Sequence, residues 1–363
     1  MYSPTWGFFL DLPEDYVYID GNELDRYSFA NPDGAMLDLI VYNAEPGHPE
    51  HYPSLEDLVQ DVQNRLNNRG GVAYYEYRQR DAFIMELSFV LFDSGGRLNY
   101  LSGWAFFAEL DQIEATHVPM LAVLAYGPAE RRNLEMLHLS ALNSIAPREA
   151  DRLAPGPITE FSFPRETPIE MPVFDLDITS RFYAEDAEGA QYLIEREFEI
   201  LVHYSETAHW RDAWIRYYRA IFRDSFERLA HAAFQIDMVF NTTFNNRDFA
   251  ESVLGWVQNF NYERDFSGSD FVNLVSALTE GRGDCDTRAM LMAVILNHSN
   301  ISSGIMVSRE FSHAMCLVDL PGTGARFETE GNNYLVAETT APVRLGLISQ
   351  SMSDVQYWIG ILF

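Results

Sequence analysis

The residues best suited to chemistry lie in the stretch GRGDCDTRAMLMAVILN, residues 281–297. The two glycines at its start make a flexible approach, and Asp284 is a suitable helix N-cap. The following AMLMAVIL is apolar on every side, as a buried helix must be. Cys285 would then occupy the first turn, where unpaired backbone N–H groups carry a partial positive charge. That setting favours the thiolate, the form of cysteine that acts as a nucleophile.

Two aspartates flank Cys285 and act in the opposite direction. Asp284 and Asp286 place negative charge beside the sulfur, which opposes ionisation of the thiol. A nucleophilic cysteine at this position therefore needs a nearby cation, and histidine usually supplies it. His313 is the best candidate, because it opens HAMCLVDLP, a segment that reads as a buried strand after the turn-like SREFS.

Alternation along this strand separates its two polar side chains. His313 shares a face with Met315 and Leu317, and Cys316 falls on the opposite face, where we expect a core thiol. The same geometry argues against a metal pair of His313 and Cys316, and no further ligand stands at zinc spacing. We therefore expect no metal and no cofactor. A disulfide between Cys285 and Cys316 is the structural alternative.

A catalytic imidazole needs an acceptor on its second ring nitrogen. Glu338 suits this role, because it ends the strand-like NNYLVAETTAP, where an unpaired charge among apolar residues would be costly. Asp319, Asn332 and Asn333 are the alternatives.

Acyl transfer also needs donors for the negative charge that develops on the carbonyl oxygen. The backbone N–H of Cys285 is one such donor. Gln258, on the apolar helix LGWVQNFNY, is a candidate for the second. A helix face open to water would accommodate this amide equally well, so the spacing leaves both interpretations open.

These segments together carry a resemblance. VQNFNY, GDCDTRAMLMAVIL, SHAMCLVDL and YLVAETT, in this order, resemble the transglutaminase-like, papain-like cysteine superfamily over about residues 246–345. In that family a GDC turn opens the core helix, a histidine starts the first strand after it, and an acid on the next strand, most often Asp, completes a triad. The resemblance implies a Cys285–His313–Glu338 triad, with Glu338 in place of Asp and with Gln258 assisting the oxyanion hole.

The resemblance implies thiol-dependent acyl transfer on a peptide or protein substrate. Water as the acceptor would make the chain a cysteine peptidase or amidase, which we favour, and an amine would make it a transglutaminase. A non-catalytic peptide-binding module on the same fold is the alternative from a different class of function.

The surrounding pattern predicts an α+β protein of two domains. A Pro-rich stretch at 147–157 reads as a linker between a domain at 1–146 and a cysteine domain at 158–363, which begins with helices over 186–239. The first domain resembles a PsbP/Mog1-like α/β sandwich in WGFFLDLPEDYVYI, SLEDLVQDV and SGWAFFA and in its closing helix, which implies a binding or docking module. We expect strands at 37–45, 72–79, 82–92, 100–110 and 120–126, and helices at 54–70, 129–144, 186–204, 208–239 and 248–260.

Composition limits the partners. The chain has 363 residues and a formal net charge of −29, and such acidity argues against nucleic acid and anionic lipid surfaces. No apolar run approaches the ~20 residues of a membrane span. The start MYSPTWGFFLDLP has no signal-peptide pattern. A chain trimmed of an export signal and a cytoplasmic protein would both look like this, so the sequence leaves the compartment, like the oligomeric state, open.

Overall fold

The computed structural model describes residues 1–92, 95–111, 117–242, 245–264 and 268–363. It is an α+β protein that divides into two compact units. The first unit comprises Met1–Arg152, Gly156–Ser162 and Glu199–Trp214, and the second comprises Leu153–Pro155, Phe163–Phe198 and Ile215–Phe363. No described helix is long and apolar enough to cross a membrane.

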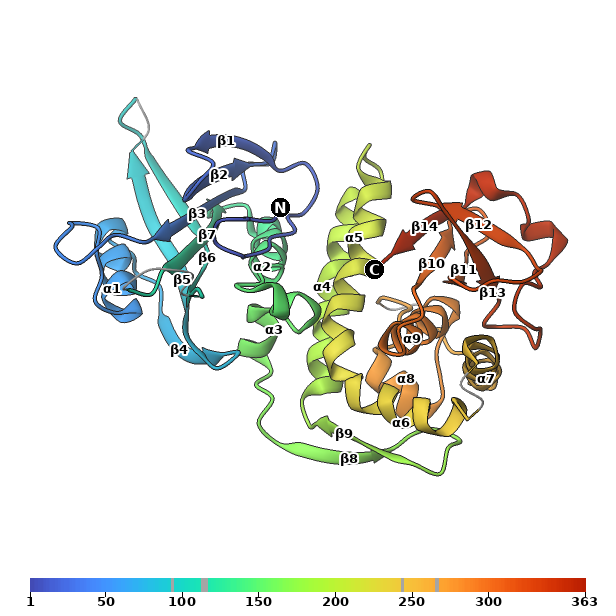
Figure 1. Ribbon diagram of the computed structural model, residues 1–363. Helices are drawn as coiled ribbons and strands as arrows, with labels where there is room; N and C mark the ends of the chain where they lie inside the picture. Colours follow the sequence, from blue (N-terminus) through green and yellow to red (C-terminus); the bar gives the residue numbers. More distant parts are fainter. Residues whose placement is uncertain (93–94, 112–116, 243–244, 265–267) are drawn as a thin grey trace. The chain divides into compact units, whose positions relative to one another are not determined.

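The first unit is built on a seven-stranded antiparallel sheet (Figure 1). Its strands run in the order β1 (Val17–Gly21), β2 (Arg26–Ala30), β3 (Met36–Tyr42), β7 (Met120–Pro128), β6 (Leu98–Glu109), β5 (Arg80–Phe92) and β4 (Val72–Tyr77). The five strands expected from the sequence are present as β3 to β7, and β1 and β2 extend the sheet beyond them. Long apolar runs in β5 and β6 alternate their side chains between two faces, so both faces need a cover.

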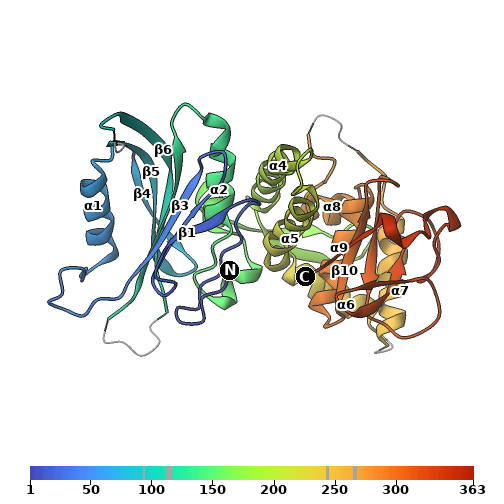
Figure 2. The ribbon, with the colours of Figure 1, turned by 90° about the horizontal axis from the view of Figure 1, so that it is seen from above.

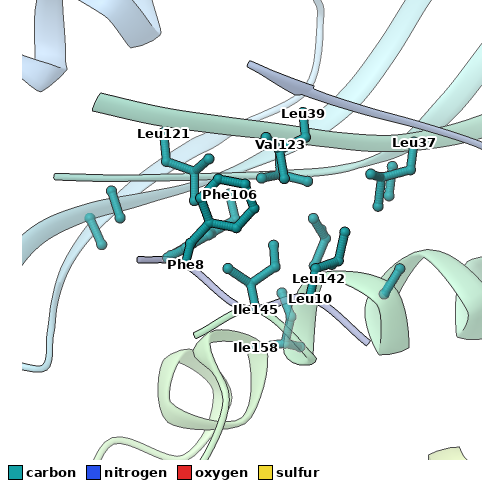
Figure 3. Close-up of a cluster of buried hydrophobic side chains, with 14 of the residues drawn as sticks. Phe8, Leu10, Leu37, Leu39, Phe106, Leu121, Val123, Leu142, Ile145 and Ile158 are labelled. Atoms are coloured by element: carbon teal, nitrogen blue, oxygen red, sulfur yellow. The ribbon is translucent and has the colours of Figure 1, made fainter. Parts of the chain in front are cut away.

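Helices cover the two faces of this sheet. Helix α1 (Leu55–Leu66) begins at its N-cap Ser54 and packs an apolar stripe on one face. Helix α2 (Glu135–Asn143) packs on the other face, as Figure 2 shows. The core under α2 joins side chains of the strands to the N-terminal segment and to residues 142–158 (Figure 3). It includes Phe8, Leu10, Leu37, Leu39, Phe106, Leu121, Val123, Leu142, Ile145 and Ile158.

The stretch expected to be a linker has structure of its own. It contains the 3₁₀ turns of Glu149–Leu153, and helix α3 (Pro157–Ser162) begins at its last residue. Helices α4 (Asp186–Tyr204) and α5 (Trp210–Arg228) are divided between the units. Residues 199–214 group with the first unit, because Tyr204 is buried there and its hydroxyl donates to the Glu14 carbonyl at 2.6 Å. The grouping thus differs from the expected domain at 158–363.

The second unit places helices against a five-stranded antiparallel sheet. Its elements are β8 (Pro168–Pro172), β9 (Thr179–Tyr183), α6 (Ala230–Phe240), α7 (Asn246–Gln258), α8 (Leu274–Glu280), α9 (Cys285–His298) and, in sheet order, β12 (Arg326–Thr329), β13 (Asn332–Ala337), β11 (His313–Val318), β10 (Ser303–Ser308) and β14 (Ile359–Leu362). Helix α9 lies on β10 and β11, and α6, α7 and α8 pack around it (Figure 1). Helix α6 shows that the helix expected over 208–239 is in fact two, because the chain breaks between α5 and α6 at Leu229.

Strand β10 corrects one expectation. The family resemblance implied that His313 starts the first strand after the cysteine helix, but β10 comes before it. The short SGIMVS segment was missed because a brief apolar run gives little periodic signal. Strand β10 pairs with β11 so that Ser308 lies opposite His313, and β11 pairs with β13 on its other side. The strands that carry His313 and Glu338 are therefore neighbours.

Candidate functional site

The GRG turn before Cys285 needs both of its glycines. Gly281 ends α8 in the left-handed region at φ 65°, and a Cβ there would lie 2.3 Å from the ring of Phe174. Gly283 has φ 153°, and a Cβ there would lie 2.6 Å from Thr287. The Asp284 side chain then accepts the Thr287 N–H at 2.9 Å, as a helix N-cap does. The turn is thereby compact enough to place Cys285 at the start of α9.

The chain that follows α7 is fastened to this turn. Asn261 donates its N–H to the Gly281 carbonyl at 2.7 Å and accepts the Gly283 N–H at 3.1 Å, which makes a short parallel bridge. The buried Arg288 reinforces it by donating to the carbonyls of Phe260 and Gly283 at 2.7 and 3.1 Å. This bridge brings Tyr262, the next residue after Asn261, to the thiol.

The Cys285 thiol is 5% exposed and meets three polar groups. The Ala314 N–H, directly after His313, donates to the sulfur, and the Tyr262 hydroxyl is also hydrogen-bonded to it. The thiol donates to Asp286 Oδ1 at 3.4 Å. The bond from Ala314 places the start of β11 beside the sulfur, so the backbone that carries His313 adjoins Cys285.

Burial raises the pKa of the Cys285 thiol, and the charges of Asp286 and Asp284 raise it further, against the opposing bond from Ala314. Burial and the two carboxylates thus act against the helix N-terminus, which on sequence grounds favours the thiolate. The group is therefore a thiol in the unliganded protein at neutral pH. Chemistry at this sulfur requires removal of its proton by a base.

His313 and Glu338 form a close pair. His313 Nε2 lies 2.8 Å from Glu338 Oε2, and the other Glu338 oxygen accepts the N–H and hydroxyl of Thr340 at 2.8 and 2.6 Å. Burial alone would raise the pKa of Glu338, but the bonds from His313 and Thr340 outweigh it and hold the pKa below its ordinary value. An ionised carboxylate fixes the ring by its Nε2 and leaves Nδ1 as the nitrogen able to take a proton.

Gln258, which the resemblance places at the oxyanion hole, bonds the backbone through its side-chain amide in this structure. Its Nε2 donates to the carbonyls of Glu338 and Val343, both at 2.9 Å. These two bonds use both hydrogens of the side-chain amide, so none is left for a substrate oxygen in this arrangement. The geometry gives Gln258 another part, which is to hold the backbone at the end of β13 and thus the position of Glu338.

Several neighbours of the site were not identified from the sequence. Trp358, 3% exposed, packs near the His313 ring with centroids 6.4 Å apart, and Phe311 packs on Trp358 at 5.5 Å. The Tyr218 hydroxyl donates to Asp286 Oδ2 at 2.5 Å. Tyr262 was within reach of sequence analysis, because it ends the VQNFNY segment on which the resemblance rests. The others depend on long-range packing that carries no local pattern.

The cysteines and acidic groups show whether the site holds a disulfide or could bind a metal ion. Cys285 and Cys316 are both free, and Cys316 is fully buried, so the structure does not contain the alternative disulfide. In the described chain, the one group of three or more residues with metal-ligand atoms all within 4.8 Å of one another is Asp284, Cys285 and Asp286. Its two carboxylates already accept from Thr287 and Tyr218, so we assign no metal to it.

Comparisons with known proteins give no family. No family model and no curated protein matches the chain. Among solved structures, LpqN of Mycobacterium tuberculosis, described as involved in cell envelope biogenesis, matches with a TM-score of 0.28 and 11% identity over 38% of this chain and 82% of that one. A protein of Bacteroides thetaiotaomicron VPI-5482 matches with a TM-score of 0.27 and 9% identity over 92% of this chain and 87% of that one. Similarity this weak carries no argument, so function must be inferred from the residues themselves.

Proposed function

We propose that the second unit is a thiol-dependent acyl-transfer enzyme of transglutaminase-like, papain-like architecture, and that it hydrolyses a peptide or amide bond. The observation that carries the proposal is the 2.8 Å pair of His313 and Glu338 at the end of β11, next to the Ala314 N–H that is bonded to the Cys285 sulfur. A buried nucleophile, a base and an orienting carboxylate on three adjoining elements are the parts that this chemistry needs.

In the proposed reaction, His313 Nδ1 takes the thiol proton while the Cys285 sulfur attacks the substrate carbonyl carbon. The Cys285 N–H, at the mouth of α9, donates to the carbonyl oxygen as it becomes negative. His313 then gives its proton to the leaving amine, which departs and leaves a thioester on the sulfur. His313 next deprotonates a water molecule that attacks the thioester, and the acid is released with the thiol restored. Glu338 keeps its charge and steers the ring throughout.

The structure also supports a contrasting proposal. The raised pKa of Cys285 and its bond to Asp286 favour an unreactive, protonated thiol, which is what a non-catalytic peptide-binding module would have. A primary amine in place of water would instead make the same machinery a transglutaminase.

For the first unit we propose a binding or docking role on a PsbP/Mog1-like sandwich, which is supported by its antiparallel sheet between two helices.

A peptide mixture distinguishes these proposals without a known substrate. We expect the full-length protein, incubated with proteome-derived peptides and a fluorescent primary amine, to create new peptide termini and little amine incorporation. Mass spectrometry detects both products. The variants Cys285→Ala and His313→Ala should abolish the termini, because they lack the nucleophile and the base.

The matched control is Cys316→Ala, which removes the other thiol, on the strand that His313 begins. It should retain cleavage. Products that are equal in the wild type and in Cys285→Ala would exclude catalysis by this thiol, and incorporated amine that depends on Cys285 would replace hydrolysis by transamidation.

A further inference from the structure

Asp286 contacts the candidate nucleophile directly, although the proposed reaction gives it no part. One of its oxygens accepts the Cys285 thiol at 3.4 Å, and the other accepts the Tyr218 hydroxyl at 2.5 Å. Tyr218 is 2% exposed on α5, so the second bond is formed inside the unit. The carboxylate is therefore held on one side and directed at the sulfur on the other.

We propose that Asp286 is a positioning residue that keeps the Cys285 thiol protonated and turned away from His313 until a substrate enters. The inference rests on the proposed function and adds a means of regulating that site. A thiol has one hydrogen, and a hydrogen donated to Asp286 cannot at the same time be donated to the imidazole. The resting site is thereby protected against adventitious alkylation and oxidation, which act on the thiolate.

The neighbouring aspartate is less suited to this role. Asp284 uses an oxygen to cap α9 by accepting the Thr287 N–H at 2.9 Å, and it is 2% exposed. Asp286 lies after the cysteine, on the side of α9 that meets Tyr218. Removing Asp284 would disturb the helix start, whereas neutralising Asp286 changes the charge at the sulfur and leaves the cap in place.

Other charged groups around the Cys285 thiol also affect its ionisation, so a test of Asp286 must leave them unchanged. The elements packed around the thiol carry both positive and negative groups. Burial raises the pKa of Asp286 itself, and the Tyr218 bond opposes this by favouring the charged carboxylate. The titratable and charged groups that act on this carboxylate, on the thiol or on their direct neighbours are Asp284 and Arg288 on the turn and α9, Tyr217 and Tyr218 on α5, Tyr262, Arg264 and Asp270 between α7 and α8, and His313 and Glu338 on the sheet.

The test is the pH dependence of Cys285 alkylation in Asp286→Asn. The variant keeps the size of the side chain and removes its charge. We expect the midpoint of iodoacetamide alkylation, measured at Cys285 by peptide mapping, to fall by about one pH unit or more, so that the rate below the midpoint rises about tenfold. Thermal melting followed by circular dichroism shows whether the variant is folded.

Asp319→Asn is the matched control, because it removes an equal charge at the far end of β11, about 20 Å of strand from His313, and it should leave the midpoint unchanged. Asp286→Ala repeats the test if the asparagine disturbs packing. A folded Asp286 variant with the wild-type midpoint would overturn the inference. Alkylation needs no turnover, so a chain that cleaves no peptide can still show the shift, and a chain that cleaves peptides can lack it.

Discussion

At the residue scale, Glu338 bonds His313 and Thr340 at the same time. The shorter side chain of an aspartate could do so only if the backbone followed a different path. The extra methylene of Glu338 carries one oxygen to His313 while the other oxygen accepts both donors of Thr340. With three donors on its two oxygens the carboxylate stays ionised, which its lowered pKa reflects. The longer side chain of Glu338 can therefore hold the His313 ring as long as Thr340 restrains it.

This gives a prediction for Glu338→Gln. The amide keeps the length of the side chain but loses the charge that stabilises a protonated ring, so peptide turnover should fall by on the order of 10²–10⁴-fold. Steady-state kcat/KM on a peptide that the wild type cleaves is the measurement. Thr340→Val, which removes one donor and leaves the carboxylate, should lose much less. Wild-type turnover in Glu338→Gln would exclude the carboxylate from the mechanism.

At the scale of elements, the turn between α8 and α9 determines where the cysteine stands. Gly281→Ala should destabilise the second unit by about 1–3 kcal/mol, because a left-handed backbone costs an L-residue about 1–2 kcal/mol and the new Cβ meets the Phe174 ring. The free energy of unfolding from urea titration measures this. The loss of stability in Gly281→Ala should be accompanied by slower peptide turnover, since the turn positions Cys285.

Gly255→Ala provides the matched comparison for Gly281→Ala. Gly255 lies exposed within α7, and a Cβ there meets nothing within 4 Å. Alanine should stabilise the helix by about 0.5–1 kcal/mol. Equal stability of the two alanine variants would show that the turn tolerates a side chain and would remove the physical reason for its glycines.

The same elements show what the sequence could and could not predict. Helix α9 was predictable from its N-cap Asp284 and its long apolar run, and strands β11 and β13 from apolar runs bounded by polar residues. Strands β1 and β10 were missed, because a short strand that is exposed or buried along its whole length has no clear alternation. The partners of Gln258 and Asp286 come from segments 80 and 68 residues away, so no local pattern could assign them.

At the scale of the whole molecule, charge and pH should affect the two units differently. In the second unit, burial and the charge of Asp286 raise the pKa of Asp284 to about 7. An acid with a raised folded-state pKa binds its proton more readily in the folded protein, so it makes folding more favourable as the pH falls below 7. The first unit contains the opposite case, a buried histidine.

That histidine is His138 on α2, which is 3% exposed. Burial lowers its pKa to about 4, and its Nε2 has no hydrogen-bond partner among the described residues. Because the unfolded chain takes up a proton near the ordinary value of 6.5 and the folded chain does so near 4, folding stability is fully present above pH 6.5 and declines as the pH falls toward 4. A difference of about 2.5 pKa units corresponds to a loss of about 3 kcal/mol at the acidic end.

Calorimetric melting between pH 7.5 and 4.5 tests this in the wild type and in His138→Asn. The asparagine Nδ2 can replace the ring N–H that bonds the Tyr126 backbone, and it does not titrate. The variant should start with a lower melting temperature, because the smaller side chain leaves a cavity, and it should then lose less stability on acidification than the wild type. Parallel pH profiles for the two proteins would mean that His138 is not the group that acid attacks, and the loss would have to come from charges elsewhere on this strongly acidic chain.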